Sequence, residues 1–305
     1  MSKILTTLLL TLWLSFGAAL AGDYEDGVAA HKKKDFTTAL RKFKSAAVQG
    51  DADAQYNLGV MYSKGQGVVQ DYAEAGRWDK LAAAQSHAGA QYNLGVTYSE
   101  GNGVVQDYAE AMRWFKLAAA QGNSGAQFNL GTMYSNGHGI VQDYAEAVRW
   151  YKFAAVQGLG EAQSNIGFMY GNGQGVVQDY AEAVHWYKLA AAQGLALAQY
   201  NLGVMYEKGQ GVVQDYAEAV RWYKLAAAQG DAGAKYNLGL MYAQGQRVVQ
   251  DYIRAHMWWN LAAVTGHPNA VKGRDLVAKM MTPQQITQAQ KLARECQARN
   301  YKNCD

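Results

Sequence analysis

Apolar and polar positions follow one pattern that returns every 36 residues along most of the chain. One copy occupies residues 54–85: apolar residues at helical spacing, a loop with Gly65 and Gly67, and a second apolar helical stretch after Asp71. The first helix is expected over residues 52–64. A fixed period of this length is typical of an array of stacked repeats, each of which is a helix pair. Below, the first helix of each pair is called helix A and the second helix B.

The start of helix B carries a regular polar signature. Asp71 precedes the helix, and Glu74 follows three residues later, a spacing that predicts a capping box. The same pair recurs as Asp107/Glu110, Asp143/Glu146, Asp179/Glu182 and Asp215/Glu218. We interpret these carboxylates as helix caps and not as catalytic groups.

Helix B also carries a tryptophan in every copy. Small residues at fixed positions let neighbouring helices approach closely, and the indoles are expected to fill the space between the helices as structural core residues. These tryptophans are Trp78, Trp114, Trp150, Trp186, Trp222 and Trp258.

The pattern divides the chain into an ordered array with atypical ends. Residues 54–269 form six repeats, residues 22–53 a degenerate first repeat, and residues 270–305 a polar capping hairpin. The predicted fold class is an all-α solenoid, because a single helix pair cannot bury its apolar face without neighbours.

The first 21 residues have the layout of a secretory signal peptide. Lys3 is followed by an apolar stretch and by the small residues Ala19 and Ala21, so cleavage is expected after Ala21. The predicted location is the periplasm or, beyond it, the exterior of the cell. No membrane insertion is expected after cleavage.

Charge and motifs exclude several function classes. The formal net charge of +3 includes Lys3, and no long basic stripe is present, which argues against nucleic acid as a partner. The six histidines lie at mostly unrelated repeat positions, and no metal-ligand or nucleophile motif with the usual spacing occurs. We therefore predict no catalytic residues, no metal site and no cofactor.

Two cysteines, Cys296 and Cys304, stand in the last ten residues. An unbroken helix would separate their Cα atoms by about 12 Å, which is too far for a disulfide. A bond requires the helix to end near Asn300 and the chain to fold back. A disulfide and two free thiols both remain open, and the expected compartment favours the disulfide.

The repeated pattern resembles the Sel1-like repeat, a relative of the tetratricopeptide repeat. The resemblance covers residue 23 to the end of the chain and rests on the recurring A-x-Y-N-L-G-x-M-Y and D-Y-x-x-A-x-x-W-Y segments. It implies a right-handed superhelix whose A helices line a concave groove, and it implies adaptor or scaffold work, often in the bacterial envelope.

The resemblance also implies which residues face the groove. They are the residue before the asparagine of each N-L-G segment and the residue four positions later. The candidates are Tyr56, Tyr92, Phe128, Ser164, Phe168, Tyr200, Tyr236 and Leu240. Packing between helices and contact with a partner both remain possible roles for the aromatic column. Ser164 and Phe168 depart from the other copies, which is consistent with either a reshaped pocket or drift among duplicated repeats.

The sequence thus favours an exported scaffold that binds another protein and is not an enzyme. Its partner could belong to the envelope, to a toxin that this chain neutralises as a periplasmic immunity protein, or to a host. The alternative from another class is a β-lactam-binding enzyme, as described for Cys-rich relatives, but the repeat cysteines of those relatives are absent here.

Overall fold

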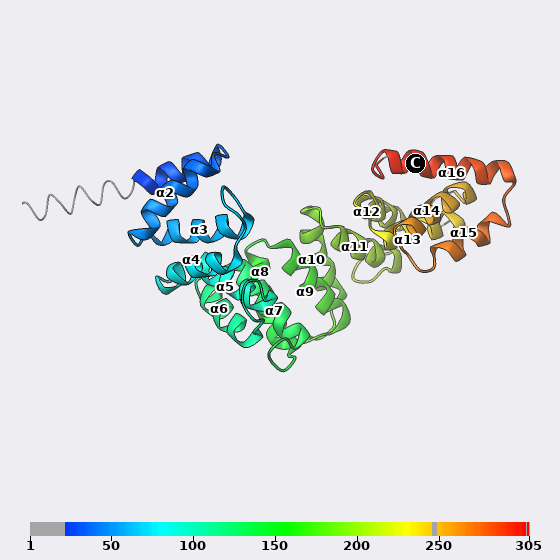
Figure 1. Cartoon of the computed structure of the whole chain (residues 1–305). Coiled ribbons are helices and arrows are strands. Elements are labelled where there is room, and N and C mark those ends of the chain that lie inside the picture. Colours follow the sequence, from blue (N-terminus) through cyan, green and yellow to red (C-terminus); the bar gives the residue numbers. More distant parts are fainter. Residues whose placement is uncertain (1–21, 246–248, 303, 305) are drawn as a thin grey trace, which may run out of the picture. The chain divides into compact units, whose positions relative to one another are not determined.

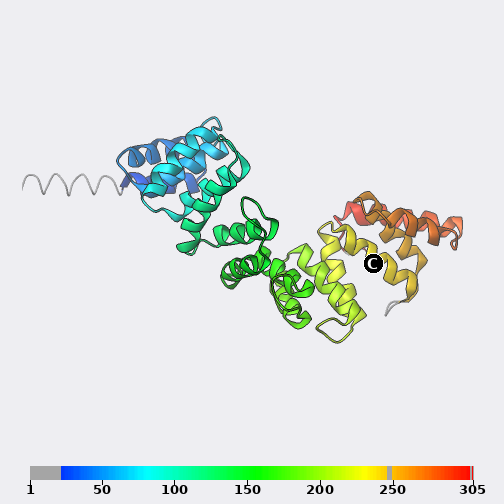
Figure 2. The same ribbon diagram turned by 90° about the horizontal axis from the view of Figure 1, so that it is seen from below.

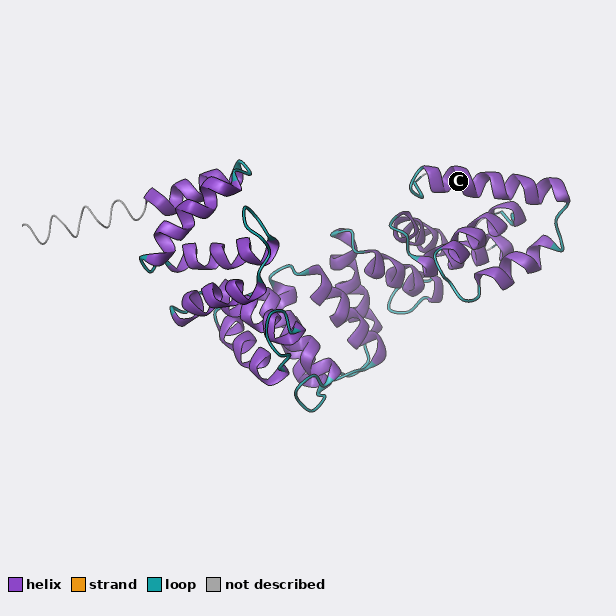
Figure 3. Ribbon diagram, viewed as in Figure 1, coloured by secondary structure: helices purple, strands orange, loops and turns teal. Residues whose placement is uncertain are grey.

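The computed structural model describes residues 22–245, 249–302 and 304, and every regular element within them is a helix (Figure 3). The expected signal peptide, residues 1–21, lies outside the described residues. Residues 22–32 are helical and precede the elements labelled in Figure 1. These are α2 (Phe36–Val48), α3 (Ala52–Lys64), α4 (Tyr72–Ala84), α5 (Ala88–Glu100), α6 (Tyr108–Ala120), α7 (Ser124–Asn136), α8 (Tyr144–Val156), α9 (Gly160–Asn172), α10 (Tyr180–Ala192), α11 (Ala196–Lys208), α12 (Tyr216–Ala228), α13 (Ala232–Gln244), α14 (Tyr252–Val264), α15 (Ala270–Ala278) and α16 (Pro283–Ala298).

The helices form two compact units, Met1–Phe153 and Ala154–Asp305, which are described separately. Within the first unit α3 packs on α4 and α5 on α6; within the second, α9 packs on α10, α11 on α12 and α13 on α14. Figures 1 and 2 show these helix pairs stacked on their neighbours inside each unit. The all-α repeat fold predicted from the 36-residue period is confirmed. No helix among the described residues is both long and apolar enough to span a bilayer.

Polar caps begin helix B as predicted, but not as a capping box. The carboxylate of Asp71 accepts hydrogen bonds from the backbone N–H groups of Ala73 and Glu74. The backbone N–H of Asp71, which a capping box would leave for Glu74, donates instead to the carbonyl of Tyr62 at 3.0 Å. The Glu74 carboxylate therefore pairs with Arg77 at 3.2 Å. The capping-box prediction was wrong because a bond across the loop occupies the donor.

The tryptophans contribute less to the core than the sequence suggested. Trp258 is buried, whereas the other five repeat tryptophans are only half-buried. The residue that follows the tryptophan is a buried aromatic residue in five repeats: Phe115, Tyr151, Tyr187, Tyr223 and, beside the buried Trp258, Trp259. Each of these rings lies against the glycine of the N-L-G segment in the preceding helix A; a Cβ on Gly131, for instance, would lie 2.6 Å from the Tyr151 ring. A glycine is needed there because the two helices touch.

Glutamine side chains connect successive repeats. Gln55 Nε2 donates to the carbonyl of Ala47 at 3.0 Å, and Gln85 Nε2 donates to Gln55 Oε1 at 2.9 Å. In the second unit, Gln199 and Gln229 form the equivalent pair at 2.8 Å. Gln55 and Gln199 are buried, and their amides are hydrogen-bonded by the exposed Gln85 and Gln229, so the helices are connected without leaving these buried polar groups unsatisfied.

The C-terminal cap departs from this arrangement. Thr282 and Gln285 form a reciprocal capping box at the start of α16, and Pro283 occupies the first helical position. Asn300 and Tyr301 adopt left-handed backbone conformations, with φ of 53° and 61°, and turn the chain back. Cys296 and Cys304 are consequently bonded, with their Cα atoms 5.0 Å apart. Of the two possibilities left open by the sequence, the structure contains the disulfide.

Candidate functional site

The surface considered first is the helix-A face. It comprises the residues before each N-L-G asparagine, namely Tyr56, Tyr92, Phe128, Ser164, Tyr200 and Tyr236, and those four positions later, namely Val60, Val96, Thr132, Phe168, Val204 and Leu240. Both rows stand on the A helices α3, α5, α7, α9, α11 and α13. The first three members of each row belong to the first unit and the last three to the second.

In the first unit the aromatic members of this face are half-buried and pack against rings of neighbouring elements. Tyr56 stacks on His87, the cap of α5, with ring centroids 4.5 Å apart. Tyr92 lies 6.0 Å from Phe115, centroid to centroid. Phe128 stands 5.6 Å from the ring of Tyr151. Packing against neighbouring rings therefore covers part of each of these side chains, and the rest is exposed.

In the second unit Phe168 departs from its counterparts. Its side chain is 49% exposed, whereas Leu240 and Val204 at the same repeat position are half-buried. Tyr236 is held between the rings of Trp259 and His267, with centroid distances of 6.2 and 4.1 Å. Phe168 is therefore the most exposed aromatic side chain among the members of this face in the second unit.

Ser164 does not lie on the exposed part of the face, contrary to the sequence-based expectation. Its side chain is only 3% exposed, and its hydroxyl oxygen is buried without a hydrogen-bond partner. A serine side chain ends one atom beyond Cβ, so it does not reach the surface as the tyrosines of other repeats do. One turn earlier, Leu195 covers Gly160, whose Cβ position would lie 2.8 Å from a leucine methyl carbon. Of the two altered residues in α9, only Phe168 is available to a partner.

The helix-A face of the first unit contains a pocket of about 390 Å³ between consecutive A helices. Helices α3 and α5 form its walls, and α4 forms its floor. The lining residues are Tyr56, Val60, Ser63, Lys64, Tyr72, Ala75, Asp79, Tyr92, Asn93, Val96, Thr97, Glu100 and Asn102. Four of them, Tyr56, Val60, Tyr92 and Val96, belong to the two rows expected to face a partner.

The floor of this pocket holds a buried carboxylate. Asp79 is 3% exposed, and its Oδ1 accepts a hydrogen bond from the Asn93 amide at 3.3 Å. Burial raises the pKa of Asp79 to about 7, and the bond from Asn93 opposes this only in part. Burial, and next to it the charge of Asp79, also raises the pKa of Tyr56. An ionised Asp79 therefore has few internal partners and would be stabilised by a cation from outside.

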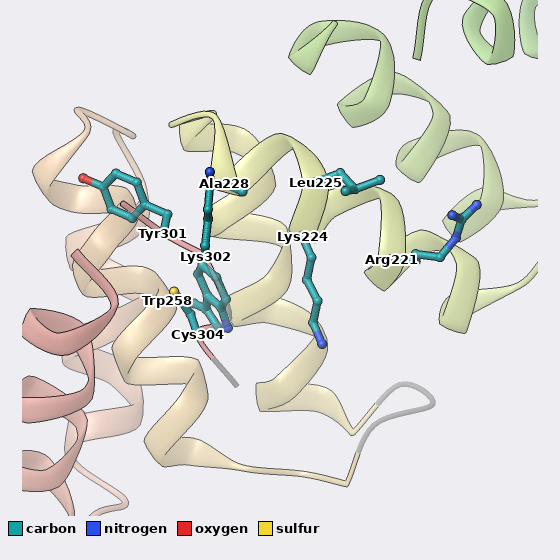
Figure 4. Close-up of a pocket in the computed structure, with 8 residues that line it drawn as sticks. All are labelled: Arg221, Lys224, Leu225, Ala228, Trp258, Tyr301, Lys302 and Cys304. Carbon is teal, nitrogen blue, oxygen red and sulfur yellow. The ribbon is translucent and has the colours of Figure 1, made fainter. Parts of the chain in front are cut away.

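The second unit has a different pocket, of about 500 Å³, at its C-terminal end (Figure 4). Arg221, Lys224, Leu225 and Ala228 of α12 line one side, and Trp258, Tyr301, Lys302 and Cys304 complete it. Arg221 is already committed, since it pairs with Glu218 at 2.9 Å and lies 4.4 Å from the Trp222 ring. The charge of Arg221 is thus already paired within the chain.

Beside this pocket, Lys235 occupies the repeat position that carries glutamine in the other copies. Its side chain is fully buried, and its ammonium group lies 3.4 Å from the centroid of the Tyr301 ring. Burial lowers the pKa of Lys235 to about 8. The turn that ends at Cys304 places Tyr301 over this lysine, which gives the C-terminal disulfide a structural role.

No constellation for catalysis emerges from the described residues. They contain no cluster of three or more His, Cys, Asp or Glu side chains that could hold a metal ion. His87 caps α5 by accepting from Ala90 N–H at 3.1 Å, and it lies 3.1 Å from the Asp53 carboxylate. His267 accepts from Asn269 N–H at 3.3 Å. Both therefore serve in local structure at the start of an A-type segment.

Comparison with known families gives consecutive matches to the Sel1 repeat. They cover residues 52–87, 88–123, 124–159, 160–195, 196–231 and 232–263. The chain belongs to the Sel1 repeat family. This confirms the family resemblance stated from the sequence. Comparison with curated protein sequences gives no significant match.

Solved structures of Sel1 repeat proteins resemble this chain. A Sel1 repeat protein from Oxalobacter formigenes is 36% identical, with 79% of this chain and 99% of that one covered and a TM-score of 0.71. The protective antigen c5321 of uropathogenic Escherichia coli, which displays the same repeat fold, is 25% identical over 94% of this chain and 86% of its own, with a TM-score of 0.52. The immunity protein Pa5087 of Pseudomonas aeruginosa is 22% identical over 72% and 86%, with a TM-score of 0.42.

Within this Sel1 repeat chain, sequence reasoning missed Asp79 and Lys235. Both are single exceptions in a column: Asp79 stands where the five later repeats carry an aromatic residue, and Lys235 where the five earlier ones carry glutamine. For Asp79 the signal is a polar residue in an aromatic column, but the adjacent tryptophan, one position earlier, masks it as the expected buried residue of helix B. For Lys235 the signal is a charged residue in a column of glutamines.

Proposed function

We propose that this protein is an exported scaffold that binds another protein through the helix-A face and performs no chemistry itself. The observation that carries the proposal is the solvent-open pocket between α3 and α5, because two rows of that face form its walls. Protein-interaction sites combine such pockets with exposed aromatic and aliphatic side chains. The Sel1 repeat is a scaffold fold, which supports a binding role over a catalytic one.

Export is supported by the signal-like segment of residues 1–21 and by the Cys296–Cys304 bond. Structural disulfides persist in oxidising compartments and are rare in the cytosol. We propose the periplasm as the first destination. Envelope proteins, a delivered toxin or a host protein are the classes of partner that the following experiment separates.

The test is affinity capture with residues 22–305, from periplasmic extract and from host secretions, followed by mass spectrometry. Phe168→Ala is expected to reduce capture of the partner about tenfold or more, because exposed aromatic anchors dominate binding energy. The matched control is Leu189→Ala on α10, an apolar residue of similar exposure, 40% against 49%, on a B helix of the same unit. An equal loss of captured partner in both variants would contradict the proposal. So would the absence of any captured protein with the wild type.

A further inference from the structure

The position of Asp79 in helix B is occupied by a buried aromatic residue in every later repeat. In the later repeats its aromatic ring fills the space above the N-L-G glycine of the preceding helix. In the first full repeat the carboxylate of Asp79 occupies this place, and a Cβ on Gly59 would lie 2.7 Å from Asp79 Oδ1. The smaller side chain keeps the close approach of the two helices but does not fill the volume of a ring.

The consequence is visible in two equivalent pockets. The next repeat has a pocket of about 180 Å³, whose lining includes Ser99, Tyr108 and Phe115. These stand 36 positions after Ser63, Tyr72 and Asp79 of the pocket of about 390 Å³. The phenylalanine-to-aspartate exchange thus accompanies a doubling of the open volume at the same place in the repeat.

The carboxylate of Asp79 accepts fewer hydrogen bonds than it can. A carboxylate accepts up to about four hydrogen bonds. Among the described residues, Asn93 supplies one to Oδ1, and no donor is bound to Oδ2. The Asp79 side chain is nevertheless only 3% exposed to solvent. Burying a charge with so few partners is unfavourable unless an opposite charge reaches it.

The surroundings match an organic cation. The rings of Tyr56, Tyr72 and Tyr92 border the pocket, and aromatic faces attract ammonium and guanidinium groups. The other charged lining residues are Lys64 from α3 and Glu100 from α5, both exposed, so that the pocket with ionised Asp79 has a net negative charge. Within the described part of the chain, no ion pair or hydrogen bond joins Lys64 to Asp79, and the carboxylate is left for another cation.

We propose that this pocket receives the lysine or arginine side chain of the bound protein and that Asp79 pairs with its charged end. The proposal rests on the proposed function, because it assigns a chemistry to one contact of the helix-A face. The aromatic walls hold the aliphatic part of the side chain, and the carboxylate at the floor selects for charge. A neutral side chain of the same length leaves Asp79 buried and unpaired and is rejected.

The affinity for such a cation depends on pH. Burial raises the pKa of Asp79 to about 7, so at pH 6 about a tenth of the molecules carry the charge that the cation needs. Arginine remains protonated throughout this range. Binding is therefore expected to be about tenfold weaker at pH 6 than at pH 8. Lys64 and Glu100 also line this pocket, and His87 stacks against Tyr56. The variant Asp79→Asn, used below, separates the effect of the Asp79 charge from any effect of these three residues.

The experiment is an NMR titration of residues 22–305 with two probes, acetyl-Gly-Arg-Gly-amide and its citrulline counterpart, which has the same shape without the charge. The arginine peptide is expected to shift the Asn93 side-chain signals and to bind at least about tenfold more tightly than the citrulline peptide. Asp79→Asn is expected to remove both this preference and the pH dependence. Asp79→Phe, the residue of the next repeat, is expected to abolish binding by filling the pocket.

Equal affinity for the two peptides, an undiminished preference in Asp79→Asn, or no binding of the arginine peptide by the wild type would each overturn the inference. Thermal unfolding of the two variants verifies that they are folded. If the peptide experiment fails but Phe168→Ala still reduces partner capture, only the assignment of the pocket is wrong. If Phe168→Ala does not reduce partner capture, the proposed function itself is wrong.

Discussion

Replacing Asp79 by tyrosine is expected to stabilise the first unit by roughly 2–4 kcal/mol at pH 8. The side chain is 3% exposed, and its pKa is raised from 3.8 to about 7 by burial. The shift corresponds to roughly 4 kcal/mol of unfavourable free energy for the ionised form. Tyrosine removes this cost and adds a ring that packs as Tyr151 does on Gly131. Adjustment of the pocket walls offsets part of the gain.

The gain has a defined pH dependence. Below about pH 4 the carboxyl is protonated in both the folded and the unfolded chain, and it imposes no cost. Between about pH 4 and 7 the unfolded chain releases this proton while the folded chain keeps it, so stability falls as pH rises. Above about pH 7 the full cost is present. The difference in unfolding free energy between Asp79→Asn and wild type should therefore grow by roughly 4 kcal/mol from pH 4 to pH 8.

Urea unfolding at the two pH values measures this difference, and Asp79→Asn serves as the control because it keeps the shape of the side chain without its charge. Parallel pH profiles of wild type and Asp79→Asn would contradict the assignment of a strained carboxylate to this position. Such a loss of stability is expected where a buried charged group is paired only when its ligand is bound.

Replacing Trp258 by alanine is expected to destabilise the second unit by about 3–5 kcal/mol. Trp258 is 2% exposed and belongs to the cluster that joins α12, α13, α14 and α16, with Met241, Leu261 and Cys296 among its members. Removal of the indole leaves a cavity among these helices. Because stability in repeat arrays depends on interfaces between neighbours, the C-terminal helices should unfold first.

Hydrogen exchange by mass spectrometry, read helix by helix, measures this effect. Trp114→Ala is the matched control, since Trp114 occupies the same repeat position but is half-buried, and its loss should cost clearly less. Equal costs for the two variants would mean that all repeat tryptophans contribute alike, as the sequence pattern alone suggested.

The helix bounds could be predicted closely from the sequence because their signals are local. Helix A was expected over 52–64 and is found as Ala52–Lys64, since the apolar spacing and Gly65 define both ends. The capping box could not be excluded, because the bond from Asp71 N–H to the Tyr62 carbonyl depends on how the loop closes. The disulfide likewise depended on the left-handed turn at Asn300 and Tyr301.

The candidate site was predicted only in outline. Tyr56, Val60, Tyr92 and Val96 are brought together around one pocket, but the group that distinguishes it, Asp79, was not identified. Successive residues of a helix lie about 100° apart, so helical spacing could not decide whether Trp78 or Asp79 faces the preceding helix. Ser164 was expected on the exposed part of this face but is 3% exposed, because the serine side chain is too short to reach the surface there.

The central claim is that a protein binds the helix-A face. Its most direct test is photo-crosslinking in living cells, with a photoreactive phenylalanine analogue incorporated in place of Phe128 or Phe168 on A helices, and of Leu117 or Leu189 on B helices. We expect the same protein to be crosslinked from Phe128 and Phe168 and not from the two leucine positions. Crosslinks from the leucine positions alone, or from all four positions alike, would contradict the claim.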